Sequence, residues 1–258
     1  MGGAGEGGVC GAPTAPAQVK AYARSCGKRA KTDRLDASLI AAFMAERPGL
    51  GRVLPSEDTL KIKGLSAKRR QLLAMQKALP CQTKQHRDAD IQSLDAALDA
   101  VLDAQIEALD HALATLIKGR AALARRAALL CSVTGIGKVI LTTLLAEMPE
   151  LGTLTAKTAA ALAGLAPMAR DSGKFGGKRF IQGGHEVVRT ALHPGSSPGQ
   201  AMASMVASTH DPQMETFATG LKVRGKSHKQ AMIAVARKLI IAANAVLKRQ
   251  TEWVKVVA

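Results

Sequence analysis

The chain has 258 residues, and 47% of them are apolar, so it is long enough and apolar enough to fill a sizeable core in one or two domains. Aromatic residues make up only 2%, which favours helices built on alanine and leucine over regular β-architectures. The formal net charge of +16 favours polyanionic partners such as nucleic acid, an anionic membrane surface or a ribosome, and by itself specifies no activity.

Cysteine usage points to a reducing compartment, and hydropathy predicts no membrane span. The four cysteines are scattered without metal-ligand spacing, as in a cytoplasmic protein with structural thiols. No run of eighteen apolar residues appears, so we expect no membrane span. Residues 1–17 are Gly-rich and lack the features of a signal peptide, and we expect a disordered leader there.

The first predicted helices are short, and they are followed by a longer basic one. One helix is expected from about Gln18 to Ser25. A second holds the stretch KTDRLDA (residues 31–37) and ends before Pro48. A basic amphipathic helix then runs from about Glu57 to Leu79, where Pro80 interrupts or ends it.

The longest periodic segment follows and predicts a helix with a narrow apolar seam. Residues 87–117 hold seven acids and one base, which leaves +22 on the rest of the chain. This segment therefore should not face nucleic acid, and we expect it to pack against another helix of this chain or of a second copy. The seam residues are Ile91, Leu94, Leu98, Leu102, Ile106, Leu109, Leu113 and Leu116.

From about Leu129 the chain predicts a helix, a Gly-Ile-Gly turn and another helix, then a short helix that stops at Pro167. Residues 169–193 are Gly-rich, basic and loop-like, with a short β-hairpin around Lys178 to Gln182. The final helix is clear over residues 226–250. The expected divisions are a leader at 1–17, a first domain at 18–55, a helical hairpin at 56–128 and a C-terminal domain at 129–258.

Gly135, Ile136, Gly137 and Lys138 resemble the turn of a helix-hairpin-helix motif. In that motif glycines bring backbone N–H groups close to a DNA phosphate at the start of a helix. The alternative is a plain turn between two helices that needs glycine for backbone reasons.

Ser172 lies in a basic loop, with Lys174, Lys178, Arg179 and Arg189 within eighteen residues of it. These cations could hold a phosphodiester for attack by an activated serine. The alternative is a Ser-Gly turn that touches phosphate without chemistry.

Asp33 and Asp36 are three residues apart, so their carboxylates share a helix face and can bind one Mg²⁺ ion. The alternative is an ordinary helix start, with Thr32 as the N-cap and acids in the first turn.

The lead-in to the final helix carries Lys222, Arg224, Lys226 and Lys229, which either meet phosphates or form a solvated basic face. The histidines, His193 among them, show no ligand spacing and are assigned no role.

The order of these segments is more specific than any one of them. KTDRLDA is followed by a long helical hairpin, SVTGIGKV, GLAP, DSG, the pattern GKRFIQGGHEVVR and GKSHKQAMIAVARKL. In this order they resemble the DEDD-type transposases of the insertion sequence 110 family, over roughly residues 16–253.

The resemblance implies a mainly α-fold with part of an RNase H-like (RuvC-like) domain, a coiled-coil hairpin and a helical C-terminal transposase domain. It implies an insertion-sequence transposase or recombinase that cleaves and rejoins DNA through a serine nucleophile and Mg²⁺-binding acids. Ser172 then takes the place of the nucleophile, and Asp33 and Asp36 that of the last two of four acids. The implied partners are DNA, a structured guide RNA and further copies in a dimer or tetramer, in a nucleoid-associated cytoplasmic protein.

The resemblance also places the first two acids upstream of residue 1, and Pro194 and Pro198 stand where an apolar helix is usual in the family. We therefore expect this chain to bind Mg²⁺ weakly, and to bind DNA or structured RNA without recombining it unaided. The alternative function is a non-catalytic DNA- or RNA-binding protein, or an inhibitor of full-length transposase. A basic ribosome-associated protein also fits the charge but leaves the motifs unexplained.

Overall fold

The structure is a computed structural model and describes residues 16–27, 33–46, 55–84, 86–168, 179–193 and 203–254. These residues form eleven helices and two short strands, which confirms a mainly α-fold. The chain divides into two compact units, residues 1–56 and 57–258, each described by itself below. The described part of the first unit holds no strand, so the RNase H-like portion of the expected fold stays a prediction.

The first unit contains α1 (Pro16–Ser25) and α2 (Asp33–Glu46), which pack against each other. The rings of Tyr22 and Phe43 lie 5.3 Å apart, and Phe43 and Leu39 are buried. The hydroxyl of Tyr22 donates a hydrogen bond to Oε1 of Glu46 at 2.6 Å. This bond to a carboxylate raises the pKa of Tyr22, since the phenol is held in its protonated form.

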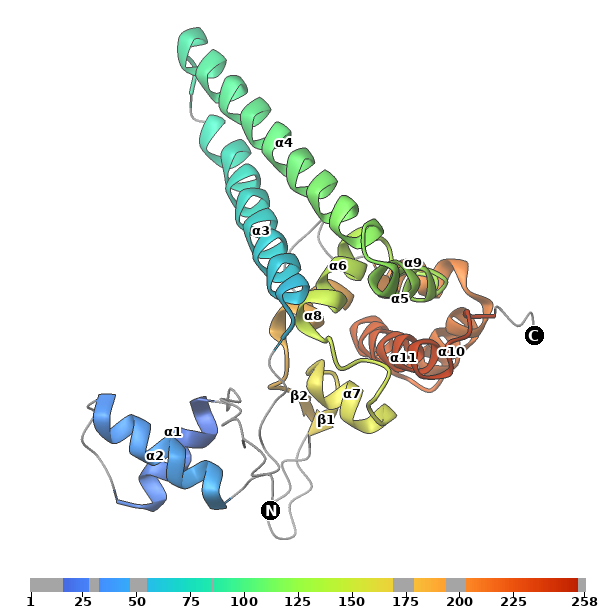
Figure 1. Ribbon diagram of the computed structural model, residues 1–258. Coiled ribbons are helices and arrows are strands. Elements are labelled where there is room, and N and C mark those ends of the chain that lie inside the picture. Colours follow the sequence, from blue (N-terminus) through green and yellow to red (C-terminus); the bar gives the residue numbers. More distant parts are fainter. Residues whose placement is uncertain are drawn as a thin grey trace. The chain divides into compact units, whose positions relative to one another are not determined.

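The second unit begins with a long helical hairpin of α3 (Glu57–Thr83) and α4 (Ala89–Lys118), drawn in cyan and green in Figure 1. Apolar residues close the space between the two helices, with Leu72 and Leu79 of α3 packed against Leu102 and Ile106 of α4. The acidic face of α4 also binds α3: the guanidinium of Arg69 donates to both carboxylate oxygens of Asp110, and Gln76 donates to Asp99 and Asp103. The acids of α4 thus stabilise the hairpin.

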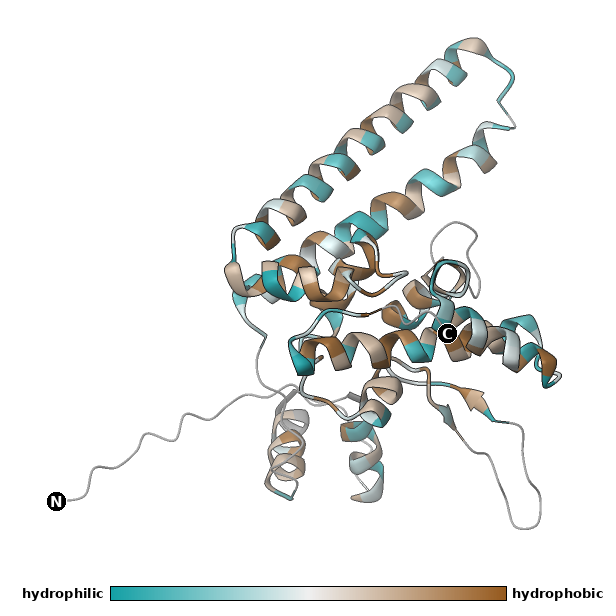
Figure 2. Cartoon of the chain, turned by 90° about the vertical axis from the view of Figure 1, so that its right-hand side faces the viewer, coloured by the Kyte–Doolittle hydropathy of each residue, from teal (hydrophilic) through white to brown (hydrophobic). Residues whose placement is uncertain are grey.

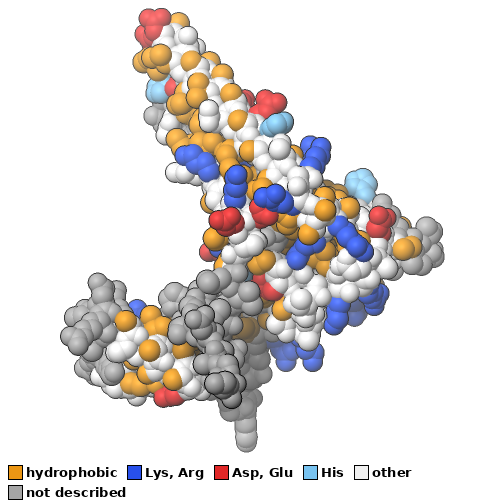
Figure 3. Space-filling model, viewed as in Figure 1, with side chains coloured by type: hydrophobic (Ala, Val, Ile, Leu, Met, Phe, Trp, Pro, Cys, Tyr) orange, Lys and Arg blue, Asp and Glu red, His pale blue; other side chains and the backbone are white. Residues whose placement is uncertain are grey.

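Two expectations about the hairpin need correction. Helix α3 continues three residues past Pro80, because a proline near a helix end removes only one backbone hydrogen bond. The apolar seam of α4 is buried only toward the root of the hairpin. At its outer end Ile91, Leu94 and Leu98 are 42%, 70% and 45% exposed, and Figure 3 shows apolar side chains open on that part of the surface.

The C-terminal body packs the remaining helices around α11 (Figure 1). A two-stranded antiparallel sheet at one edge pairs Pro167 with Ile181 and Met168 with Phe180. The strands are β1 (Pro167–Met168) and β2 (Phe180–Ile181), and the helices are α5 (Ala121–Cys131), α6 (Lys138–Glu147), α7 (Ala156–Leu162), α8 (Glu186–Leu192), α9 (Ala203–His210), α10 (Pro212–Val223) and α11 (His228–Arg249).

Helix α11 is the core of this body and contacts α5, α7, α8, α9 and α10. Its start is fixed by a capping box, in which Ser227 and Gln230 each bind the other's backbone N–H. Its middle is buried on nearly all sides. Figure 2 shows hydrophobic residues, in brown, along the helices of this body. Helix α11 is long and apolar enough to cross a membrane, but most of that apolar stretch lies inside the protein, which identifies it as a core helix.

Helix α8 was not expected from the sequence, where residues 169–193 appear loop-like. It forms because Val188 and Leu192, four residues apart, both turn into the core and are fully buried. The predicted division between residues 128 and 129 falls within α5, which packs against both α4 and α11.

The root of the hairpin is joined to the body by a buried carboxylate. Glu147, the last residue of α6, is 8% exposed and lies 3.3 Å from the ammonium of Lys63 and 3.5 Å from the guanidinium of Arg70, both on α3. A buried carboxylate without such partners would be costly, so these bonds fix where α3 meets α6.

Two further polar contacts join chain segments to α11 and its end. Asn244, buried within α11, accepts from the N–H of Gly152 and donates to the carbonyl of Leu154, both at 2.8 Å. After the helix, Trp253 donates from its indole to Asp211, the N-cap of α10, at 2.8 Å. Both contacts hold loops in place, because buried backbone and indole N–H groups need acceptors.

We expect Asn244→Ala to lower the free energy of unfolding by roughly 2–4 kcal/mol, because it leaves one buried N–H and one buried carbonyl without partners. Urea unfolding followed by circular dichroism measures this, with Gln105→Ala on the exposed face of α4 as the control. Equal stability of the two variants would show that the 152–154 loop does not depend on Asn244.

Candidate nucleic-acid interface

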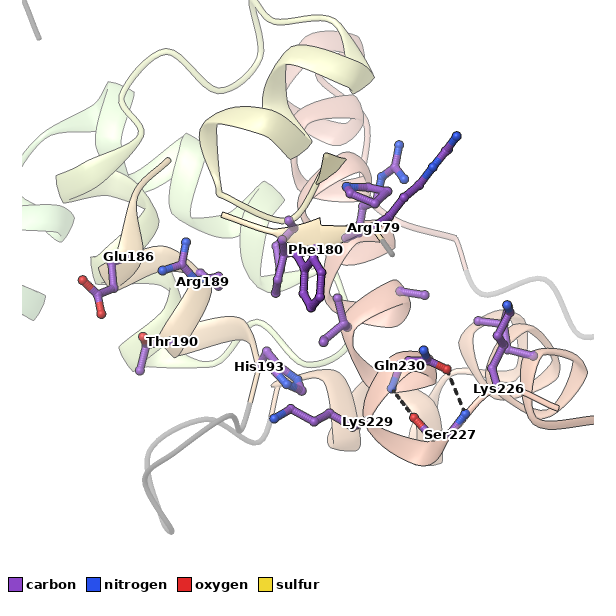
Figure 4. A pocket seen from close by; sticks show the side chains of 17 residues that line it. Arg179, Phe180, Glu186, Arg189, Thr190, His193, Lys226, Ser227, Lys229 and Gln230 are labelled. Carbon is purple, nitrogen blue, oxygen red and sulfur yellow. Dashed lines mark hydrogen bonds between the residues drawn. The ribbon is translucent and has the colours of Figure 1, made fainter. Parts of the chain in front are cut away.

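A groove of about 1200 Å³ lies on the C-terminal body between the two strands, α8 and the first half of α11. Figure 4 shows side chains from all of these elements around it. Its floor is apolar, formed by Leu165, Ile181, Leu221 and Ile233. Its polar lining consists of Arg179, Glu186, Arg189, Thr190, His193, Lys226, Ser227, Lys229, Gln230 and Arg237.

The charge of the groove is strongly positive. Its cations are Arg179, Arg189, Lys226, Lys229 and Arg237, and its lining includes one acid, Glu186. None of the five is within ion-pair distance of a carboxylate among the described residues. In Figure 3 Lys and Arg gather over the C-terminal body and the hairpin root, whereas the outer end of the hairpin is acidic and apolar. Unpaired cations around one groove attract a polyanion.

The turn from β2 to α8 positions Arg189. Arg189 donates from its guanidinium to the carbonyl of Gly183 at 2.6 Å. The turn lies against the end of α7, where the N–H of His185 donates to Leu162 at 2.7 Å. Gly184 has φ +63°, and a Cβ there would lie 2.4 Å from the nitrogen of Gly164, so only glycine allows this approach.

Arg179, Arg189 and Lys226, three of the predicted nucleic-acid contacts, line the same groove although they are up to 47 positions apart in the chain. Ser172, Lys174 and Lys178 lie outside the described residues. The segment that contains them leaves β1 after Met168 and returns at Arg179, and the paired ends of β1 and β2 lie at the groove wall.

The Gly-Ile-Gly turn connects α5 to α6 and does not line the groove. Gly135 has φ +98°, and a Cβ there would lie 2.6 Å from the carbonyl oxygen of Ala203, so packing against α9 requires glycine. Gly137 has open space around its Cβ position and is the N-cap of α6, where it and Lys138 are exposed. Packing therefore accounts for Gly135, whereas Gly137 and Lys138 form an accessible helix N-terminus.

Asp33 and Asp36 lie in the first turn of α2, which begins at Asp33. Within the described residues no three or more His, Cys, Asp or Glu side chains come together as metal ligands. The described part of the first unit has one further acid, Glu46, at the opposite end of α2, where it binds Tyr22. The described donors thus do not complete an Mg²⁺ site, and the pair of aspartates stays a candidate half-site.

Arg237 and His193 of the groove were missed as site residues. Lys229, Ile233 and Arg237 are spaced four apart, so they lie on one face of α11, and this spacing could have placed Arg237 beside Lys229. His193 follows α8 and is buried in the groove wall. Its burial depends on how α8 packs, and no local pattern signals it.

These features define a mainly helical protein whose C-terminal body presents a cationic groove suited to a polyanion. Comparison with known proteins identifies its family. Residues 127–219 match the model of the transposase IS116/IS110/IS902 family, and residues 4–89 match a second model, which describes DEDD-type transposases. The chain is 32% identical over 251 residues to the pilin gene-inverting protein of Moraxella bovis, covering 93% of this chain and 73% of the relative. The pilin gene-inverting protein of Moraxella lacunata matches equally well. The chain belongs to the IS116/IS110/IS902 transposase family.

We expect Gly135→Ala to destabilise the protein by about 3 kcal/mol, because the added methyl group meets a backbone carbonyl at a strained φ. Gly137→Ala should cost no more than about 1 kcal/mol, the effect of alanine at an N-cap. Thermal unfolding of the two variants measures the difference. Gly137→Ala should fold, so it also tests whether the turn contacts a phosphate. We expect this variant to bind DNA several-fold more weakly than the wild type. Unchanged binding would show that the turn only connects two helices.

Proposed function

We propose that this protein is a DNA transposase or recombinase whose C-terminal body holds a strand in the cationic groove while Ser172 attacks it. The observation that carries the proposal is the position of the strand ends: Met168 and Arg179 flank the segment that contains Ser172, and β1 and β2 line the groove. Family membership makes DNA the expected substrate.

The proposed reaction conserves the number of phosphoester bonds. The oxygen of Ser172 attacks the phosphorus of a phosphodiester, the serine proton passes to the leaving sugar oxygen, and a phosphoseryl ester remains. A sugar hydroxyl of a second strand then reverses this step and releases the serine. Arg179, Lys174 and Lys178 stabilise the negative charge that builds up on the phosphate oxygens during both steps.

Asp33 and Asp36 are the residues of this chain that would hold a divalent cation. Their carboxylates are the hard oxygen ligands that Mg²⁺ prefers, and at positions i and i+3 of a helix they can reach one ion. Bound Mg²⁺ would supply Lewis-acid stabilisation of the reacting oxygens.

The partners proposed beyond DNA are a structured guide RNA and further copies of this chain. The outer half of the hairpin supports an oligomer, because Leu94 and Val101 are 70% and 57% exposed on a helix whose seam is buried only toward the root of the hairpin. The two Moraxella relatives are named for the inversion of a pilin gene, and we propose that this chain likewise rearranges a DNA segment.

A covalent DNA adduct tests the serine. The chain is not expected to complete recombination unaided, so the assay follows only the first step, the attack by Ser172. We expect wild-type protein, incubated with Mg²⁺ and a labelled duplex that carries its insertion-sequence end, to give a protease-sensitive band on a denaturing gel. The band should disappear in Ser172→Ala and persist in Ser93→Ala, an exposed serine of α4. An adduct that survives Ser172→Ala would overturn the assignment of the nucleophile.

A non-catalytic nucleic-acid-binding protein is the second candidate function, favoured by the same groove. Both functions require groove cations to contact phosphates. Affinity falls as salt rises, and each phosphate contact to duplex or single-stranded DNA contributes about 0.7–0.9 to the steepness of log affinity against log salt. We therefore expect the double variant Lys226→Gln, Arg237→Gln to make this dependence shallower by about 1.5.

Fluorescence anisotropy measures this slope, with Lys118→Gln and Lys248→Gln, both exposed and outside the groove lining, as the matched control. Groove binding without any adduct from the wild-type protein would select the non-catalytic function. An unchanged slope in the groove variant would contradict both functions.

A further inference from the structure

His193 is a buried polar residue of the groove to which the proposed reaction gives no role. It directly follows α8, and its backbone N–H donates to the carbonyl of Arg189 at 3.0 Å. The residue is only 6% exposed, yet its ring lines the groove and lies close to Lys229, as Figure 4 shows. Its backbone is therefore fixed at the end of α8, and its side chain borders the groove.

Neither ring nitrogen of His193 has a hydrogen-bond partner within the described part of the chain. A neutral imidazole carries one donor and one acceptor, and a protonated imidazole carries two donors. Leaving such atoms buried and unpaired is unfavourable, and native proteins rarely do so without a functional reason. Because His193 lines the groove, a ligand bound there is the candidate for its missing partner.

The surrounding charges decide what kind of partner this is. Burial and the Lys229 ammonium lower the pKa of His193, which favours the neutral ring in the free protein. The charged side chains that line the groove are Lys229 and Arg237 of α11, Arg189 and Glu186 of α8, Arg179 beside β2, and Lys226 before α11. With five cations against one acid, an anion is the partner that gains most from this position.

The start of α11 adds to the attraction. Ser227, Lys229 and Gln230 form the first turn of this 22-residue helix and line the same groove. The N-terminus of a long helix carries a partial positive charge that favours anions. The unpaired, buried ring of His193 is a second observation, independent of the helix, that points to a ligand at this place.

We propose that His193 and Lys229, at the start of α11, form a subsite for a backbone phosphate of the DNA strand, separate from the phosphate that Ser172 attacks. Phosphate offers several acceptor oxygens, so one oxygen can accept a hydrogen bond from the imidazole N–H while another binds the ammonium. The inference rests on the proposed function in so far as that function brings DNA into the groove. His193 acts as a binding and positioning residue and does not touch the reacting phosphorus.

The size and lining of the groove favour a strand over a free anion. At about 1200 Å³ the groove is far larger than a phosphate ion, and its apolar floor suits sugar and base surfaces. A phosphate at His193 would therefore anchor a strand that extends along the floor toward Arg179 and the two β-strands. Such an anchor would set which phosphodiester reaches Ser172.

Binding at this subsite is linked to protonation. A bound phosphate adds a negative charge beside His193 and raises its pKa from the lowered value of the free protein. The complex therefore takes up a proton, and affinity rises as the pH falls toward the pKa of the free ring. A histidine with a purely structural role would not give this dependence.

The test is the binding of a fluorescent single-stranded DNA oligonucleotide to the full chain at constant salt between pH 5.5 and pH 8. We expect wild-type affinity to rise about tenfold across this range, which corresponds to one unit of coupled pKa change. His193→Gln, which keeps a donor and an acceptor but does not titrate, should show a flat profile. His111→Gln, an exposed histidine of α4, should follow the wild type. A wild-type profile in His193→Gln would overturn the subsite.

Lys229→Gln is a second variant that does not depend on how the core tolerates changes at His193, since Lys229 is exposed. Removing the ammonium relieves its repulsion of the protonated ring, so the midpoint of the pH profile should move to higher pH. An unmoved midpoint would contradict the pairing of Lys229 with His193.

Two further arms identify the ligand. Inorganic phosphate should compete only weakly, and equal affinity for phosphate and oligonucleotide would overturn the assignment to a strand. An RNA of the same sequence that binds tenfold more tightly than DNA would overturn the assignment to DNA. The adduct assay separates this subsite from the proposed function. Wild-type protein that forms the Ser172 adduct but binds DNA with no pH dependence would contradict only the subsite. Wild-type protein that shows the pH dependence but forms no adduct would contradict only the recombinase function.

Discussion

The burial of helix α11 is the constraint on which the C-terminal body depends. Leu239, Ile240 and Ala243 are fully buried, and five other helices contact α11. Each large aliphatic side chain of this kind stabilises the fold by about 1.5–3 kcal/mol. The helix can be apolar at its centre and cationic at its start because only its first turns lie beside the groove. Its packing thus positions Lys229 and Arg237 as a direct consequence of filling the core.

Polar contacts then fix segments that hydrophobic packing leaves free to shift. Asn244 holds the 152–154 loop on α11, Glu147 joins α6 to the root of the hairpin, and Arg189 with the 183–184 turn fastens β2 and α8 to the end of α7. Directional bonds between buried groups allow few alternative geometries. Among the groove cations, Arg189 is positioned in this way by its bond to the carbonyl of Gly183.

The hairpin and the body divide the charge of the chain between them. Asp99, Asp103 and Asp110 of α4 bind side chains of α3, and the hairpin's outer end offers apolar side chains in place of cations. The unpaired cations gather on the body. Because acidic and basic side chains are separated in this way, the protein can present one surface suited to protein contacts and a second surface suited to a nucleic acid.

The sequence by itself determined the helical class, the long hairpin helices, the final helix and the family, because periodicity and ordered motifs are local signals. It also named Arg179, Arg189 and Lys226. It did not yield α8, the continuation of α3 past Pro80, or the reason for Gly135, since each depends on contacts with distant segments. Only the tertiary structure brought those cations together with Arg237 and buried His193 among them, because proximity between residues far apart in the chain is set by how helices pack around α11.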